Sequence, residues 1–262
     1  MADFEKYAKE IYCINAVIPS GPYTVVDFHY AGGVKNVMKQ LESKLHTEAP
    51  TIYGNTWREL LETVKGEPNK VIHSLEDPVA KEPGLKILRG NISPAGAIVR
   101  PTAVYEEVKY IKGAAKVYEC DQDAYKAIMN GEIVPGDILV IRYEGCKGAP
   151  GMKELMLSID ALIGLGLDKK VGLITDARFS GFNYGAIVGH VSPEAYDGGV
   201  IALIKNGDKI EMDIAGGTVN LLVSDEELAE RKKSWVRPPL KQQKGVLNIY
   251  AQNCRPAEEG GA

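Results

Sequence analysis

The sequence predicts an α+β fold, with a helical segment over residues 1–83 and a β-rich domain over residues 84–262. Two observations support this division. In the first part, apolar residues recur at helical spacing. After Glu82-Pro83-Gly84, short β-branched runs alternate with Gly and Pro, a pattern typical of a barrel or a mixed β-core.

Two helices are expected in the first part. Residues 34–41 place apolar side chains three and four positions apart, and Gly32-Gly33 before them lets the chain turn into the helix. A second helix is expected after Thr56, because Glu59 three positions later completes a capping box.

The second part contains short apolar runs that are candidate strands, interrupted by helices. Asn206-Gly207 lies between two of these runs and predicts a hairpin turn. The helices are expected over Asp121–Asn130, Lys153–Leu165 and Ser224–Lys233. The expected strands are Leu85–Leu88, Ala97–Val99, Lys116–Tyr118, Ile138–Arg142, Val171–Thr175, Val200–Ile204, Lys209–Asp213 and Thr218–Val223.

The composition is that of an ordinary globular protein and argues against several classes. The net charge of -4 disfavours general nucleic-acid binding, which needs a basic surface. No apolar run approaches the ~20 residues that span a bilayer, so no membrane association is expected. The scattered cysteines form no CxxC pair, which disfavours a disulfide framework or a zinc site and indicates a reducing cytoplasm. They are Cys13, Cys120, Cys146 and Cys254.

The first segment that carries chemistry covers residues 142–154, directly after an apolar strand. Its residues Gly148 to Gly151 bring backbone amides close to the strand end, where they favour an anion. Glu154 is expected in the first turn of the next helix. There it either complements the helix dipole or points into the cleft as a metal-binding carboxylate.

The second segment covers residues 175–185 and also follows an apolar strand. Ser180 is expected in a tight turn, and a serine needs a base, a metal or a positive field to lose its proton. Arg178 supplies such a charge, and its guanidinium suits a substrate carboxylate; alternatively it pairs with Asp176 beside a turn serine. A serine hydrolase is disfavoured, because Arg178 stands where the GxSxG motif has its first glycine.

Two histidines near glycines complete the polar positions. His190, before Val191-Ser192-Pro193, is either a proton shuttle or a structural residue, and His29 leaves the same choice open. The glycine-rich stretches form neither a Walker loop nor a dinucleotide fingerprint, so nucleotide binding is not expected.

Taken in order, these segments resemble the dihydroxy-acid dehydratase/phosphogluconate dehydratase family. The resemblance covers nearly the whole chain. It is carried by residues 143–154, 174–181 and 189–195, and also by residues 19–21, 27–33, 88–91, 94–97 and 223–229.

The resemblance implies a fold and an activity. Members dehydrate 2,3-dihydroxy acids or sugar acids to 2-keto acids, using magnesium and an iron–sulfur cluster. It implies that Ser180, as alkoxide, is the catalytic base at C2, that Glu154 is a metal ligand, and that Arg178 and Gly181 bind substrate. It also implies that residues 84–262 form the family's C-terminal swivelling β/β/α barrel and residues 1–83 the end of its N-terminal domain.

The resemblance further implies a partner. The family's cluster cysteines lie in the N-terminal domain, so this chain alone is expected to bind no cluster. It is expected to work with a cluster-bearing N-terminal half as partner chain, in a homo- or hetero-oligomer. Phe182 and Tyr184 depart from the usual small, polar stretch and are expected to crowd the substrate pocket.

Two alternatives remain open. One is a non-catalytic binding or regulatory protein derived from the dehydratase, which Phe182 and Tyr184 favour. The other, an independent metal-dependent hydrolase or isomerase, is disfavoured because only one convincing metal carboxylate, Glu154, is visible.

Overall fold

The computed structural model describes residues 2–261. The chain forms two compact units. The smaller comprises Lys6–Gly84, and the larger comprises residues 2–5 and 85–261.

The smaller unit is built from short helices joined by irregular chain. The helix predicted over residues 34–41 is confirmed as α3, and the capping box of Thr56 and Glu59 is confirmed at the start of α4. The Glu59 carboxylate accepts a hydrogen bond from the Thr56 amide at 2.7 Å, and the Glu59 amide donates one to the Thr56 hydroxyl at 3.2 Å. The helices are α1 (Ala2–Ala8, which spans both units), α2 (Val25–Tyr30), α3 (Gly33–Gln40) and α4 (Trp57–Glu62).

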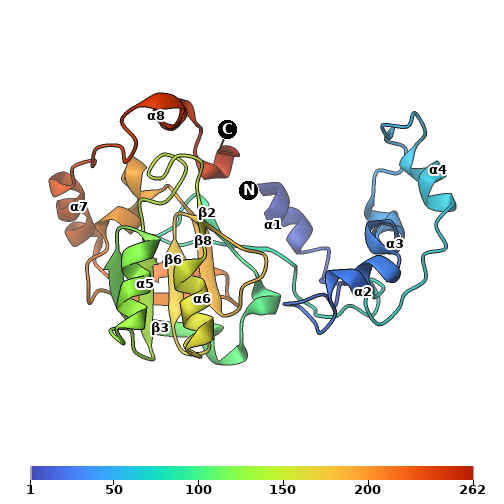
Figure 1. Ribbon diagram of the computed structural model, residues 1–262, viewed down its shortest axis with the longest axis horizontal. Helices are drawn as coiled ribbons and strands as arrows, with labels where there is room; N and C mark the ends of the chain where they lie inside the picture. The colour runs from blue at the N-terminus through green and yellow to red at the C-terminus, as the bar shows by residue number, and fades with distance from the viewer. Residues whose placement is uncertain (1, 262) are drawn as a thin grey trace. The chain divides into compact units, whose positions relative to one another are not determined.

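The larger unit is built on an eight-stranded mixed sheet, which confirms the α+β class (Figure 1). Its order is β1-β2-β8-β6-β4-β3-β9-β10. The four central strands β8, β6, β4 and β3 are parallel, and the outer strands pair antiparallel. The strands are β1 (Lys86–Leu88), β2 (Gly96–Val99), β3 (Tyr110–Tyr118), β4 (Asp137–Ile141), β6 (Gly172–Thr175), β8 (Ala186–Ser192), β9 (Lys209–Asp213) and β10 (Thr218–Leu221).

The sheet curls until its two ends meet. A parallel bridge joins Arg89, just after β1, to Thr218 at the start of β10. The Arg89 amide donates to the Gly217 carbonyl at 3.0 Å, and the Val219 amide donates to the Arg89 carbonyl at 2.9 Å. Because the end strands are paired, the sheet forms a nearly closed barrel with few free edges. Apolar side chains from around the sheet fill its interior, including Leu88, Val99, Val140, Val188 and Val219.

A second apolar core lies outside the barrel. The helices α5 (Asp121–Met129) and α6 (Leu157–Gly164) run side by side over one outer face of the sheet (Figure 1). They bury Ile128 and Ile159 against strand residues Leu139 and Leu173. The larger unit therefore has three layers: the two opposite walls of the barrel, with one core between them, and the helices packed outside one wall over the second core.

One strand prediction is wrong. Val200–Ile204 is not a strand, because Val200–Leu203 forms the 3₁₀ helix η5, whose apolar residues contribute to the barrel core. The run is almost wholly buried, and a buried apolar run has no periodicity that separates strand from helix. Asn206-Gly207 therefore makes a turn from η5 into β9 and not a hairpin between two strands.

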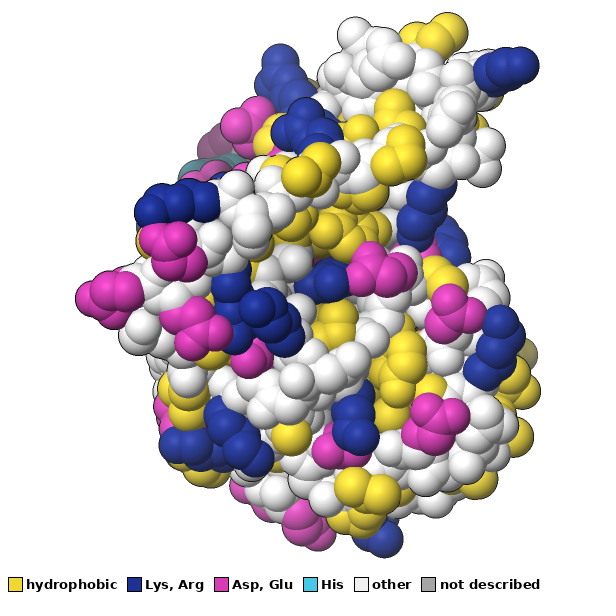
Figure 2. All heavy atoms as spheres, turned by 90° about the vertical axis from the view of Figure 1, so that its left-hand side faces the viewer, with side chains coloured by type: hydrophobic (Ala, Val, Ile, Leu, Met, Phe, Trp, Pro, Cys, Tyr) yellow, Lys and Arg dark blue, Asp and Glu magenta, His cyan; other side chains and the backbone are white. Residues whose placement is uncertain are grey.

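The C-terminal part adds two helices. α7 (Asp225–Ser234) begins as predicted at Ser224, whose hydroxyl accepts from the Glu227 amide at 3.3 Å, and α8 (Gly245–Asn253) follows. On the face shown in Figure 2, basic and acidic side chains are interspersed, and neither sign forms a continuous patch. Across residues 2–261, every helix is too short or too polar to span a membrane.

Candidate functional site

The polar segments leave the sheet at one edge. β4, β6 and β8 are parallel neighbours, with Ile141 opposite Thr175 and Ile174 opposite Val188. Their carboxyl ends therefore lie together. The segments that follow them are the β4 loop (residues 142–153), the serine segment (residues 176–185) and the turn after β8 that contains Glu194.

Two very short strands bring Glu154 and Arg178 together. β5 (Glu154–Leu155) pairs in parallel with β7 (Arg178–Phe179), and Glu154 stands directly opposite Arg178. The prediction that Glu154 lies in the first turn of a helix is wrong, because α6 begins only at Leu157. The backbone before α6 pairs with β7, and the Asp121 carboxylate caps the helix through the amides of Leu157 at 3.2 Å and Ser158 at 3.1 Å.

Ser180 follows β7 in a turn that is open to solvent. Its side chain is half-buried, while Arg178 and Gly181 are exposed. The amide of Phe182 donates to the Ser180 Oγ at 3.0 Å. A backbone donor aimed at this oxygen favours its negatively charged form.

Asp176 ties the segments together. Its buried carboxylate accepts from the amides of Tyr143 and Glu144 in the β4 loop, each at 3.0 Å, and from the amide of Ala195 after β8 at 2.9 Å. Burial raises the pKa of Asp176 to about 6, although these donors oppose the rise. With its acceptors directed at backbone amides, Asp176 has no ion pair with Arg178, so that interpretation of Arg178 is wrong.

Glu194 occupies the glycine-rich part of the β4 loop. Its carboxylate accepts from the amides of Lys147 at 2.9 Å and Gly148 at 3.0 Å. The anion favoured by these amides is therefore a side chain of the same protein. Gly145 makes room for it, because a Cβ there would lie 2.5 Å from a Glu194 oxygen. Burial raises the pKa of Glu194 to about 7.

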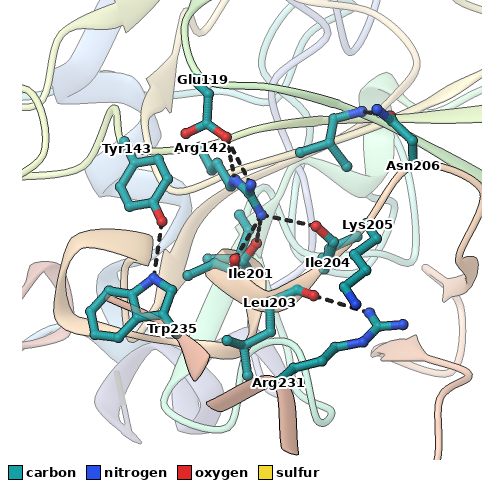
Figure 3. A network of polar contacts seen from close by, with 12 residues as sticks. Glu119, Arg142, Tyr143, Ile201, Leu203, Ile204, Lys205, Asn206, Arg231 and Trp235 are labelled. Carbon is teal, nitrogen blue, oxygen red and sulfur yellow. Dashed lines mark hydrogen bonds and ion pairs between the residues drawn. The ribbon is translucent and has the colours of Figure 1, made fainter. Parts of the chain in front are cut away.

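Arg142 and Tyr143 fix the base of the β4 loop (Figure 3). The Arg142 guanidinium donates to the carbonyls of Ile201, Ala202 and Ile204 at 2.8–3.2 Å, and it pairs with Glu119 at 2.7 Å. Figure 3 also shows the Trp235 indole donating to the Tyr143 hydroxyl, at 3.1 Å.

The next residue, Glu144, is fully buried and lies between two lysines. Its carboxylate oxygens are 3.0 Å from the Lys153 Nζ and 3.1 Å from the Lys241 Nζ. Two positive charges at this distance offset part of the free-energy cost of burying the carboxylate. Together these contacts make the β4 loop a rigid wall of the site.

A β-bulge turns His190 toward the serine segment. Gly96 pairs with Ser192 while Ile98 pairs with Gly189, so β8 has one extra residue between these pairs. His190 lies in this bulge with φ 55°, and its amide donates to the Ala177 carbonyl at 2.8 Å. Its ring meets the edge of Phe179 at 6.3 Å between centroids. Burial, and then the charge of Arg178, lowers the pKa of His190.

The aromatic residues after Ser180 have different surroundings. Tyr184 stacks on Tyr105 with ring centroids 6.1 Å apart, whereas the Phe182 ring is 63% exposed. Tyr184 is therefore held against the segment after β2. Phe182 contacts Tyr184 edge to face, with ring centroids 6.1 Å apart, and leaves most of its apolar surface exposed near Ser180. His29 belongs to α2 in the smaller unit.

The side chains fit one ligand of a magnesium site. Glu154 presents an exposed carboxylate, and Mg²⁺ commonly takes one or two carboxylates while keeping several waters. Between residues 2 and 261, no three His, Cys, Asp or Glu side chains gather as a ready-made metal site. Further oxygen ligands would have to come from substrate, water or another polypeptide.

The cysteines do not fit an iron–sulfur cluster. Such a cluster is held by several thiolates. Cys146 and Cys254 pack with Met152 in a small apolar cluster, where burial raises the pKa of Cys146 to about 11. Cys13 belongs to the smaller unit, and Cys120 precedes α5 in the larger unit, outside that cluster.

Two models of one protein family match this chain. The family model described as dihydroxy-acid/6-phosphogluconate dehydratase C-terminal matches residues 70–261, and the N-terminal model of that family matches residues 1–60.

Curated relatives named dihydroxy-acid dehydratase agree with this match. The relative from Clostridium novyi (strain NT) is 43% identical over 99% of this chain and 48% of its own length. Those from Caldanaerobacter subterraneus and Geobacter sp. (strain M21) are 45% and 44% identical, over 92% and 98% of this chain and 44% and 46% of their own lengths. The chain thus spans about half the length of these relatives, and it belongs to the dihydroxy-acid/6-phosphogluconate dehydratase family.

Proposed function

We propose that this chain is the serine-bearing part of a dehydratase that converts a 2,3-dihydroxy acid or a sugar acid to a 2-keto acid. One observation carries the proposal: Ser180 stands in an open turn with a backbone donor on its Oγ, next to the strand pair that joins Glu154 and Arg178. Family membership supplies the reaction class, because the matched relatives are named dihydroxy-acid dehydratase.

In the proposed reaction Ser180, as alkoxide, removes the proton at C2 of the acid. The electron pair of that C–H bond forms the C2–C3 double bond as the C3–O bond breaks. The C3 hydroxyl leaves with the bonding pair and, with one proton, is released as water, and the resulting enol tautomerises to the keto acid. The Phe182 amide stabilises the negative charge on the Ser180 Oγ before proton transfer. A preorganised donor of this kind acts without reorganising solvent during the reaction.

The neighbouring residues have supporting roles in this proposal. Glu154 is one ligand of a magnesium ion, which when bound neutralises the negative charge that develops on the substrate. Arg178 and Gly181 line the substrate pocket, and both are exposed beside Ser180. The buried carboxylates Asp176 and Glu194 accept hydrogen bonds from backbone amides of the segments around Ser180 and so fix the positions of these segments.

We further propose that a cluster-bearing N-terminal half acts as the partner chain. Apolar side chains of α2 and α3 support this, because Val25, Val26, Tyr30 and Val34 are all exposed. Exposed apolar patches mark surfaces that bind other polypeptides. The larger unit is then the family's swivelling barrel, working in an oligomeric enzyme of the cytoplasm.

The test mixes this chain with a cysteine-bearing N-terminal half and measures formation of a 2-keto acid. Replacing Ser180 by Ala is expected to lower kcat by roughly 10³-fold or more, because no other group takes the C2 proton. Ser234→Ala, an exposed serine at the end of α7, is the matched control and should leave kcat unchanged. Full activity of Ser180→Ala would remove the assigned base.

A further inference from the structure

We propose that Glu144 is a positioning residue for Glu154 and that it acts through the ion pair with Lys153. The inference rests on the proposed function only for the role of Glu154 as a magnesium ligand. Its geometric basis is independent, because it concerns how the short strand β5 is held against β7.

The direction of Glu154 follows from the residues on either side of it. Successive side chains of an extended chain point to opposite faces. The Lys153 Nζ lies 3.0 Å from the buried Glu144 carboxylate, and Leu155 is fully buried in the second apolar core. With both neighbours held on the inner side, Glu154 is left on the outer side, where it is exposed.

The chain turns sharply just before β5 and needs contacts to hold that turn. Gly151 and Met152 both have positive φ, 89° and 50°, and a residue other than glycine adopts this region only where its surroundings fix it. The Met152 side chain is buried against Cys146, with the two sulfur atoms 3.6 Å apart. The ion pair of Lys153 is a further contact at this turn, and it acts on the residue directly before β5.

Glu144 provides a charge whose position is itself fixed. Its side chain is fully buried, and its amide donates to the Asp176 carboxylate at 3.0 Å. The other carboxylate oxygen lies 3.1 Å from the Lys241 Nζ, which also donates to the Glu119 carbonyl at 3.2 Å. Because an ion pair is stronger where water is partly excluded, Lys153 is held toward a point that the serine segment and the C-terminal segment both support.

Hydrogen exchange of the full chain tests this anchoring without turnover. Glu144→Gln keeps the shape of the side chain and removes its charge. Both lysines are partly exposed and can turn to water, so the variant is expected to fold. Measured against the central strands β4 and β6, the amides of β5 and β7 should exchange about 10-fold faster than in the unaltered chain, as expected for loss of a charged hydrogen-bonded pair.

Turnover with the partner half gives a second readout. The magnesium concentration for half-maximal rate should rise about 10-fold in Glu144→Gln, the effect typical of losing a group that orients a metal ligand. The kcat at saturating magnesium should change less, because Ser180 and its backbone donor are untouched. Lys153→Met should behave in the same way, and Lys153→Arg, which keeps the charge, should restore most of the magnesium affinity.

Lys126→Met is the matched control, because Lys126 pairs with Asp123 on the exposed face of α5. It should alter neither exchange at β5 nor the magnesium dependence. Unchanged relative exchange at β5 in both Glu144→Gln and Lys153→Met overturns the inference, as does a loss of kcat with unaltered magnesium dependence. If exchange at β5 rises but the unaltered chain and the partner half form no keto acid, the proposed function fails and the positioning of Glu154 stands.

Discussion

The carboxylates of Asp176 and Glu194 shape the site through the backbone. Each accepts amide donors from the segment beside it, and together they join the β4 loop, the serine segment and the turn after β8. Their burial raises both pKa values, to about 6 and about 7. Two buried side chains therefore fix the positions of the loops through their hydrogen bonds to backbone amides.

This arrangement predicts a pH dependence of stability. Glu194 in the unfolded chain loses its proton near pH 4.5, whereas in the folded chain it keeps the proton until about pH 7. Between these values the folded state binds more protons, so the free energy of unfolding falls as pH rises and is level above pH 7. The size is at most ~3 kcal/mol.

Urea unfolding at pH 5 and pH 8 measures this fall. Glu194→Gln cannot ionise, so its fall should be smaller than that of the unaltered chain; the remainder comes from Asp176, which titrates at lower pH. Glu107→Gln, at an exposed position, is the control and should behave like the unaltered chain. An unchanged pH dependence in Glu194→Gln would show that Glu194 is already ionised across this range.

The chemical residues were easier to predict than their surroundings. Ser180 and Arg178 stand out in the sequence because polar residues interrupt apolar runs at a strand end. The arrangement of these segments in space does not, since it depends on contacts between parts of the chain that are far apart in the sequence, such as the pairing of β2 with β8. The roles of Asp176 and Glu194 were missed for the same reason, because their partners lie 19 to 47 residues away.

At the scale of elements, the site depends on pieces too short to predict. Apolar strands such as β4 and β9 were predicted within a residue, because their runs are β-branched and bounded by turns. β5 and β7 have two residues each, and their existence depends on pairing between Glu154 and Arg178. β8 was not predicted, because Gly189 and His190 interrupt its apolar pattern at the bulge.

The contact between β7 and β8 gives an element-scale prediction. A Cβ on Gly189 would lie 2.6 Å from the Phe179 ring and 3.1 Å from the Ala177 carbonyl. Gly189→Ala must therefore push β7 away from β8, and Ser180 moves with it. Overpacking of this kind costs about 1–3 kcal/mol, and a displacement of about 1 Å costs ~10²-fold in rate.

The measurements are the free energy of unfolding and kcat in the presence of the partner half. Gly131→Ala is the control, because, unlike at Gly189, no atom lies within 4 Å of the Cβ position of Gly131, although its φ of 75° adds some strain. It should lower stability without the loss of kcat. Equal kcat in Gly189→Ala and the unaltered chain would mean that β7 does not position Ser180.

At the scale of the whole molecule, the two units differ in how completely they bury their apolar side chains. The larger unit closes its own sheet through Arg89 and Thr218 and buries a core inside and outside the barrel. The smaller unit leaves large apolar side chains of its helices in water, with Tyr30 84% and Val25 72% exposed. Such exposure is costly unless another polypeptide covers it.

Tyr30→Lys tests whether the proposed N-terminal half covers this surface. Because Tyr30 is exposed, the change should hardly alter the free energy of unfolding of the chain alone. At an interface, however, it removes an aromatic anchor and buries an unpaired charge, so the affinity for the partner half should fall by at least about 10-fold. Sedimentation or calorimetric titration measures this affinity, and Val236→Lys, an exposed apolar position of the larger unit, is the comparison. An affinity for Tyr30→Lys equal to that of the unaltered chain would place the partner on another surface.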